Sequence, residues 1–127
     1  MTAGTSPAAF PGRAPIEAYG NGGFRFAGMS HKGSILCLPE AITAWGETDA
    51  ALLTPESFAA VLGTKTGIGF LLLGTGASQV LPSPEVRRAF ADAGVGLDAM
   101  DTGAAARTYN VLLAEGRPIA AALIAVN

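Results

Sequence analysis

The stretch Gly74-Thr75-Gly76 contains residue types that nucleotide-binding proteins use, because an apolar run precedes it and a helix start follows it. Strand, glycine turn and helix together can hold a phosphate. A dinucleotide fingerprint would also need a glycine where Gln79 stands, and its helix would begin directly after the turn. Prolines at positions 82 and 84 delay the helix, and there is no Gly-Lys-Ser/Thr sequence. We therefore expect a turn that lets chain and sheet approach closely, rather than a phosphate site.

A second stretch, Asp101-Thr102-Gly103, matches the tripeptide that carries the catalytic aspartate of aspartic proteases. In those enzymes two carboxyl groups share a proton and activate water. Here the tripeptide stands late in the chain and is followed by the helix-forming sequence AAARTYNVLLAEG. We therefore predict that Asp101 or Thr102 caps a helix by accepting its first free amides, and that the aspartate charge favours the positive helix end.

Arg107 and Asn110 share one face of that predicted helix, beside an apolar face suited to a sheet. The planar guanidinium of Arg107 could hold an anion or a partner's carboxylate. Alternatively, it could tie down strand-end carbonyls or Asp101 within the monomer. One arginine and one asparagine without a base form a structural network more readily than a catalyst.

The remaining reactive residue types are isolated. His31 is the only histidine and is predicted in an exposed turn, and Cys37 is the only cysteine, so a disulfide and a Cys-rich zinc site are excluded. Cys37 shares a strand face with Ile35, which favours a small buried hydrophobe over a reactive thiolate. We predict no catalytic residue, no cofactor and no metal. The candidate binding residues, at the carboxyl ends of strands where ligands of open α/β sheets collect, are Gly74, Thr75, Gly76, Asp101, Thr102, Arg107 and Asn110.

Length and composition limit the classes of function. The 127 residues suit one domain, and the formal net charge of −2 with 14% charged residues disfavours nucleic-acid binding. Residues 1–15 contain three prolines and lack the basic start and apolar run of a secretory signal, so we expect a flexible N-terminal arm there and a single domain over 16–127. The apolar run at 119–126 is far shorter than the roughly 20 residues that span a bilayer. Membrane insertion is therefore not expected.

The order of predicted elements indicates the fold. Strands at 16–20, 24–28 and 34–38 form an antiparallel meander, with a short strand at 41–45 and a turn at 31–33. Helices start at Pro55 and Pro84, after the caps Thr54 and Ser83, and the strands of the second half alternate with helices. This pattern predicts a three-layer α/β/α sandwich around a mixed sheet, with the meander in the first half and βαβ units in the second.

These elements also carry a family resemblance. The segments YGNGGFRFAG, GSILCLP, LLLGTGASQVLP and MDTGAAARTYNVLLAEGR, followed by AALI, resemble the Mth-type domain family, a domain of unknown function. The family includes the mitochondrial respiratory complex I assembly factor three and its bacterial relatives. The likeness covers nearly everything from Ile16 onward and implies an α/β/α fold without an established enzymatic activity. Relatives often carry cysteine where this chain has Ala106, which excludes a thiol-dependent activity at that position.

The resemblance implies a non-enzymatic binding or assembly protein of the cytoplasm. Its partners would be proteins, respiratory complex I subunits among them, and it would reach the inner membrane only through those partners. The alternative is a small-molecule or anion-binding protein, or an enzyme, that uses the strand-end cleft near Arg107. A homodimer joined through the early meander is a third arrangement.

Overall fold

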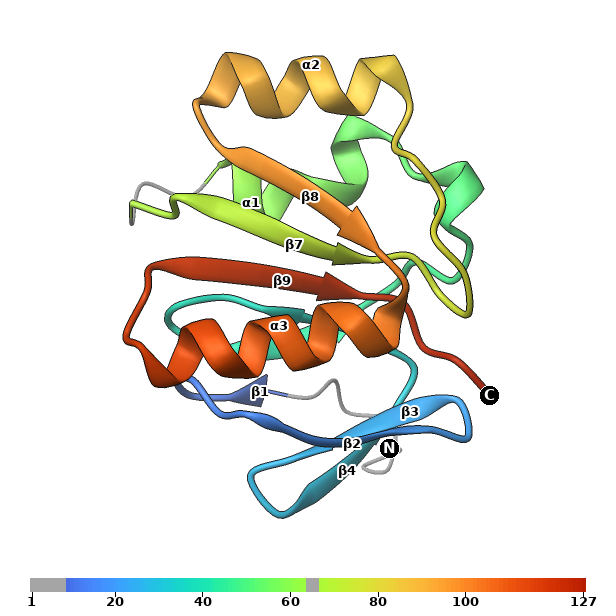
Figure 1. The fold of residues 1–127 in the computed structure, drawn as a ribbon, viewed down its shortest axis with the longest axis vertical. Helices are drawn as coiled ribbons and strands as arrows, with labels where there is room; N and C mark the ends of the chain where they lie inside the picture. The colour runs from blue at the N-terminus through green and yellow to red at the C-terminus, as the bar shows by residue number, and fades with distance from the viewer. Residues whose placement is uncertain (1–8, 64–66) are drawn as a thin grey trace.

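The computed structural model describes residues 9–63 and 67–127, which form two sheets (Figure 1). The larger sheet contains, in spatial order, β1 (Ala9–Phe10), β6 (Ile42–Trp45), β5 (Ser34–Cys37), β9 (Ile119–Leu123), β7 (Phe70–Gly74) and β8 (Gly96–Met100). The smaller sheet contains β2 (Ile16–Gly20), β3 (Gly23–Phe26) and β4 (Met29–Lys32), all antiparallel.

The larger sheet is mixed, as predicted. Strand β7 runs parallel to β8 and β9, whereas β5 is antiparallel to β9 and β6, and β1 is antiparallel to β6. The crossovers are α2 (Pro84–Ala93), between β7 and β8, and α3 (Thr102–Ala114), between β8 and β9. The short helices η2 (Ala50–Leu52), η3 (Pro55–Phe58) and α1 (Ala59–Leu62) connect β6 to β7.

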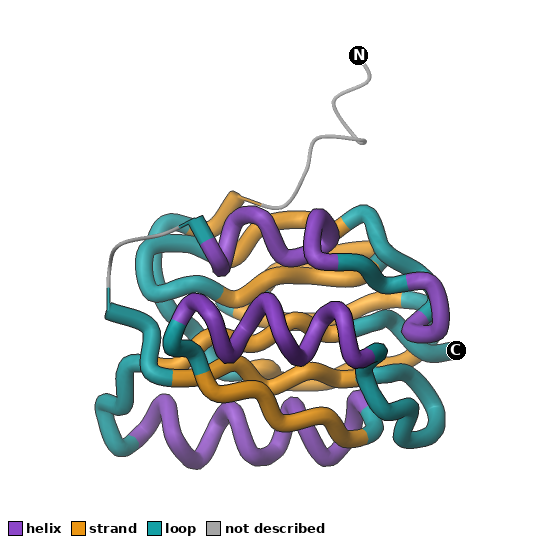
Figure 2. The backbone as a smooth tube through the Cα atoms, turned by 90° about the horizontal axis from the view of Figure 1, so that it is seen from above, coloured by secondary structure: helices purple, strands orange, loops and turns teal. Residues whose placement is uncertain are grey.

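Alternate residues of the central strands face two different layers. In β7, Leu72 packs in the cluster that contains Tyr109 of α3, whereas Leu71 and Leu73 pack in the cluster that contains Phe90 of α2. In Figure 1, α3 lies in front of the larger sheet and α1 behind it, and Figure 2 shows helices on both sides of the strands. Both faces of β7 are therefore buried, as its uninterrupted apolar run predicts. The predicted three-layer α/β fold is confirmed.

The helix ends follow the predicted capping residues. The Ser83 hydroxyl accepts a hydrogen bond from the Val86 amide at 3.2 Å, and Gly94 ends α2 in the left-handed region with φ 72°. The helix predicted to begin at Pro55 is divided into a 3-10 turn, η3, and one α-helical turn, α1, that ends at Gly63.

The prediction of a flexible arm over 1–15 is wrong for its described part. Strand β1 pairs with β6, so that Phe10 lies opposite Ile42, and Ala14 is buried. The Arg13 guanidinium donates a hydrogen bond to the Arg117 carbonyl oxygen. A two-residue strand has no recognisable pattern of its own, because its pairing partner is distant in sequence. Residues 1–8 lie outside the described part.

The predicted turn at 31–33 is also wrong, because Met29–Lys32 forms the strand β4. The hairpin turn lies earlier, at 27–28, where both residues have positive φ. Gly33, with φ 97°, then redirects the chain from the smaller sheet into β5 of the larger one. The meander thus forms its own sheet beside α3, and only β5 of the predicted meander strands belongs to the larger sheet.

Candidate functional site

Gly74 ends β7 at a point where α3 begins very close to the sheet. A Cβ atom on Gly74 would lie 3.0 Å from the Cα atom of Thr102 and 3.0 Å from a methyl carbon of Leu123. The predicted close approach of chain and sheet is therefore confirmed, since only glycine leaves room for the first turn of α3.

The end of β7, the loop after it and the first turn of α3 form a corner of the fold. The Thr102 side chain, which is fully buried, joins this corner to the end of β9. Its hydroxyl oxygen accepts a hydrogen bond from the Gly76 amide at 2.9 Å and donates one to the Ile124 carbonyl oxygen at 2.7 Å. The Thr102 amide in turn donates to the Gly76 carbonyl oxygen at 2.9 Å. The Gly76 amide, which a phosphate would need, is therefore already used within the chain.

Asp101 and Thr75 complete the internal hydrogen bonding of this corner. The Asp101 carboxylate accepts from the Ala104 amide at 2.8 Å, which confirms the predicted helix cap. The Thr75 hydroxyl donates to the Ser78 carbonyl oxygen at 2.6 Å and accepts from the Val80 amide at 3.0 Å. The two motifs that resemble catalytic or phosphate-binding sequences thus fasten α3 and the loop after β7 to the sheet.

A concavity of about 410 Å³ lies beside this corner, at the carboxyl ends of β7 and β9. The connections that leave the carboxyl ends of β7 and β8, through α2 and α3, go to opposite faces of the sheet, so the topological switch point lies between β7 and β8, whereas this concavity lies on the β9 side of β7. Of the seven candidate residues, the concavity includes Thr75 and Gly76. Its other lining residues are Thr48, Asp49, Ala50, Ala77, Val80, Ile124, Ala125, Val126 and Asn127.

Asn110 lies elsewhere, against the smaller sheet. Its side-chain amide donates to the Ile16 carbonyl oxygen at 2.9 Å, and its side-chain oxygen accepts from the Ile16 amide at 2.8 Å. Asn110 thus imitates a neighbouring strand and holds β2 against α3. The predicted grouping of Asn110 with the strand-end residues is therefore wrong, although the alternative of a structural network is confirmed for this side chain.

Arg107 is exposed on α3, and among the described residues it forms neither the predicted tie to Asp101 nor one to a strand-end carbonyl. One turn earlier, Gly103 is buried under the Tyr19 ring, whose hydroxyl would lie 2.3 Å from a Cβ atom on Gly103. The same Cβ position is 3.4 Å from an Arg107 guanidinium nitrogen. Arg107 therefore lies at the border between α3 and the smaller sheet and does not line the concavity at the ends of β7 and β9.

Cys37 and Tyr109 meet in the core between the larger sheet and α3. Cys37 is completely buried, and this burial raises the pKa of its thiol to about 12, with the Tyr109 hydroxyl as a weaker opposing influence. Burial likewise raises the pKa of Tyr109, with the nearby Arg13 guanidinium acting in the opposite direction. The prediction that Cys37 is a buried hydrophobe is confirmed. Arg13 was missed, because residues 1–15 were assigned to a flexible arm.

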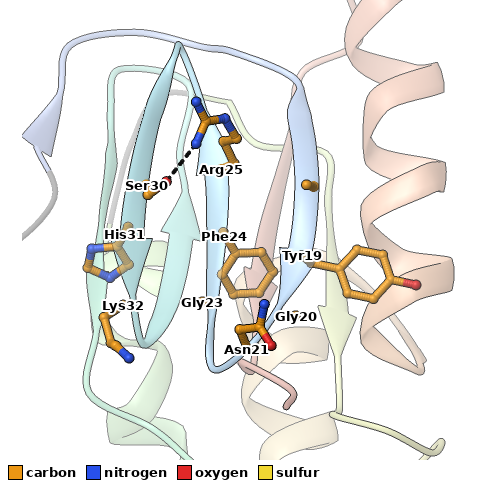
Figure 3. Close-up of a pocket in the computed structure, with 10 residues that line it drawn as sticks. Tyr19, Gly20, Asn21, Gly23, Phe24, Arg25, Ser30, His31 and Lys32 are labelled. Carbon is orange, nitrogen blue, oxygen red and sulfur yellow. Dashed lines mark hydrogen bonds between the residues drawn. The ribbon is translucent and has the colours of Figure 1, made fainter.

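A second concavity, of about 430 Å³, lies on the smaller sheet (Figure 3). None of its described lining residues carries a carboxylate. The lining residues are Ala18, Tyr19, Gly20, Asn21, Gly23, Phe24, Arg25, Ser30, His31 and Lys32. The sequence pattern does not indicate this surface, because His31 and Lys32 read as a turn and not as part of β4.

No three or more His, Cys, Asp and Glu side chains in 9–63 and 67–127 are grouped so that they could hold a metal ion. None of the helices in these ranges is long and apolar enough to cross a membrane.

Comparisons with known proteins give consistent matches. A protein from Bartonella henselae, described as an outer membrane protein, is 50% identical, with a TM-score of 0.89 over 93% of this chain and 99% of that one. A Bordetella pertussis protein described as a Mth938-like domain is 31% identical, with a TM-score of 0.74 over 88% and 85% of the two chains.

The comparison also finds a curated relative with a functional name. The mouse protein named NADH dehydrogenase [ubiquinone] 1 alpha subcomplex assembly factor 3 is 31% identical over 91% of this chain. The alignment covers 62% of the length of that mouse protein. Residues 16–124 match the profile of the family described as "Protein of unknown function (DUF498/DUF598)". This chain therefore belongs to the DUF498/DUF598 family and has its Mth938-like fold.

Proposed function

We propose that the protein is a non-enzymatic binding protein that assists assembly of a respiratory NADH:quinone oxidoreductase. The observation that carries the proposal is the 31% identity to the mouse assembly factor over 115 residues, nearly the whole of this chain. Its partners are then subunits of that complex. It works in the cytoplasm and reaches the inner membrane through these partners.

The side chains support binding rather than catalysis. Asp101 caps α3, Thr102 and Asn110 make hydrogen bonds to main-chain groups, and the thiol of Cys37 is buried with a raised pKa. A general base or nucleophile needs an accessible group with a suitably placed partner. These four residues are instead occupied in holding the fold together.

The test is deletion of the gene in its native host. We expect NADH oxidation by isolated membranes and the amount of fully assembled NADH:quinone oxidoreductase on native gels to fall. Succinate oxidation by the same membranes is the control and should not change. Re-expression of the full chain should restore NADH oxidation. Unchanged assembly of the complex in the deletion strain would refute the proposal.

A small-ligand function at the strand ends is the second candidate, because the concavity of about 410 Å³ lies at the carboxyl ends of β7 and β9, the edge of an open α/β sheet where ligands collect. Arg107, the residue expected to bind an anion in this cleft, does not line the concavity, so an uncharged ligand suits it better than an anion. Nuclear magnetic resonance of the isotope-labelled full chain, titrated with a fragment library, tests whether this concavity binds a small ligand. Saturable shifts confined to Thr75, Gly76 and Val126 would favour this candidate over a protein partner.

A further inference from the structure

Strand β4 is an open edge of the smaller sheet. It stands at the end of the order β2-β3-β4, and three of its four residues are exposed. The opposite edge strand, β2, is held by Asn110, which binds both main-chain polar groups of Ile16. In 9–63 and 67–127, no strand pairs with the outer side of β4. Such an edge offers main-chain donors and acceptors to another strand.

The hairpin geometry shows which main-chain groups point outward. The two-residue turn at 27–28 has φ angles of 50° and 73°, typical of a type I′ turn. The residues that flank such a turn, here Phe26 and Met29, form a hydrogen-bonded pair. Hydrogen-bonded and non-hydrogen-bonded pairs then alternate along β4.

The far end of β4 gives the same register. The Gly33 amide donates to the Gly22 carbonyl oxygen at 2.7 Å, so Gly33 also faces the neighbouring strand. The residues between the two ends that face away from β3 are therefore Ser30 and Lys32. Each directs an N–H and a C=O group out of the sheet, at the two-residue spacing that an added strand requires.

The outer face of the smaller sheet is cationic and hollowed next to this edge. Arg25 lies directly opposite Ser30 and donates to its hydroxyl at 2.9 Å, and Lys32 lies diagonally across on the same face (Figure 3). Glu17 forms an exposed ion pair with the Arg25 guanidinium at 3.7 Å and offsets part of its charge, so Lys32 supplies most of the positive charge of this face. Opposite Lys32 stands Gly23, where a Cβ atom would collide with the His31 carbonyl oxygen, so glycine is needed for β3 and β4 to pair.

The inner face of the same edge carries Met29 and the half-buried His31, which lie opposite Phe26 and Phe24. Met29 lies opposite Phe26, which is fully buried, yet 42% of Met29 remains exposed. A strand added beside β4 would cover Met29 with every second side chain and present the others to Lys32 and Arg25.

The geometry points to β4 as the docking edge for an extended segment of a partner protein in which acidic residues alternate with apolar ones. The acidic side chains pair with Lys32 and Arg25, and the apolar side chains cover Met29. A second copy of this chain is a poorer occupant, because its own Met29–Lys32 strand contains no acidic residue. The inference rests on the proposed function, since it names the surface by which a binding protein holds its partner.

Fluorescence anisotropy with the full chain tests this edge. The probe is a fluorescein-labelled octapeptide of alternating Glu and Val, acetylated and amidated at its ends. We expect saturable binding that a peptide with Lys in place of Glu does not show. Lys32→Glu should weaken binding about fivefold or more, whereas Arg88→Glu, an exposed charge reversal on α2, should leave it unchanged.

Two N-methylated probes separate strand addition from charge attraction alone. One carries N-methyl groups on every Glu and the other on every Val, so each removes the amide hydrogens along one edge of the peptide. Strand addition predicts that one probe binds and the other does not. Equal binding of the two, equal affinity for the Lys32→Glu and Arg88→Glu variants, or binding of inorganic phosphate at the same residues would overturn the inference.

Sedimentation of the chain alone tests whether a second copy of this chain occupies the β4 edge. A dimer that Lys32→Pro converts to a monomer would assign the edge to a second copy and refute the partner segment. Failure of the peptide to bind, together with an assembly defect in the deletion strain, would remove this surface and leave the proposed function standing.

Discussion

Replacing Asn110 by alanine tests how the smaller sheet is held to the rest of the protein. The side chain makes two hydrogen bonds, of 2.8 and 2.9 Å, to the main chain of Ile16, and both are partly buried. In Asn110→Ala, the Ile16 N–H and C=O groups lose their partners. Arg107→Ala, one turn earlier on α3 and exposed, is the matched control.

The expected loss follows from the hydrogen bonds and their burial. Each neutral hydrogen bond contributes about 0.5–1.5 kcal/mol, and a buried main-chain group without a partner costs about 1–3 kcal/mol. Because these groups are partly buried and water reaches them after the substitution, we expect Asn110→Ala to lower the free energy of unfolding by about 1–3 kcal/mol in total. Arg107→Ala should change it by less than about 0.5 kcal/mol.

Urea denaturation followed by circular dichroism gives the free energies of unfolding, and amide hydrogen exchange reports on Ile16 directly. The Ile16 amide should exchange faster in Asn110→Ala than in the control. Asn110→Asp keeps an acceptor for the Ile16 amide but faces the Ile16 carbonyl oxygen with a carboxylate at neutral pH, so it should also destabilise. If Asn110→Ala and Arg107→Ala had equal free energies of unfolding, the conclusion that Asn110 holds β2 against α3 would be refuted.

Three other substitutions test the corner and the core. Thr102→Val keeps the buried shape but removes both hydrogen bonds of the hydroxyl, so it should cost about 2–4 kcal/mol of unfolding free energy, whereas Thr102→Ser should cost about 1 kcal/mol; chemical denaturation compares them. Gly74→Ala places a methyl group 3.0 Å from the Thr102 main chain and should cost about 1–3 kcal/mol, visible as a lower thermal midpoint. Because burial raises the Cys37 pKa from 9.0 to about 12, the unfolded chain loses this proton first, so the free energy of unfolding should fall as the pH rises through 9, by about 1 kcal/mol between pH 9 and 10. Cys37→Ala should remove most of that fall between pH 9 and 10, where Tyr109, with an ordinary pKa of 10.0, contributes less, and an unchanged fall would contradict the assignment.

Local signals predicted the second half of the fold well. The Ser83 and Asp101 caps mark the starts of α2 and α3, and an apolar run marks β7, because each signal needs only neighbouring residues. The errors fall where pairing partners are far apart in sequence. Strand β1 depends on β6, and β4 reads as a polar turn because its sequence, MSHK, has only one apolar residue.

The candidate site was predicted less well, for the same reason. Asn110 was recognised as a polar residue at the core boundary, but its partner Ile16 lies 94 positions away, which no local pattern reveals. Arg25 and Lys32 come together only because β3 and β4 pair. A charge cluster built across strands cannot be found before the register is known.

The two motifs that resemble catalytic sequences share one structural purpose. Gly74 leaves room for the start of α3, Asp101 caps that start, and Thr102 joins it to β7 and β9. Helix α3 packs on the sheet through the small side chains of Ala105 and Ala106, which bring it close to the strands. Its first turn must therefore fit against the strand ends. The glycine, aspartate and threonine that satisfy this fit are the same residue types that build active sites. In this chain the strand-end polar groups are therefore engaged in packing, and we expect recognition at surfaces such as the edge of β4, where the main-chain groups of Ser30 and Lys32 point out of the sheet beside the Lys32 cation.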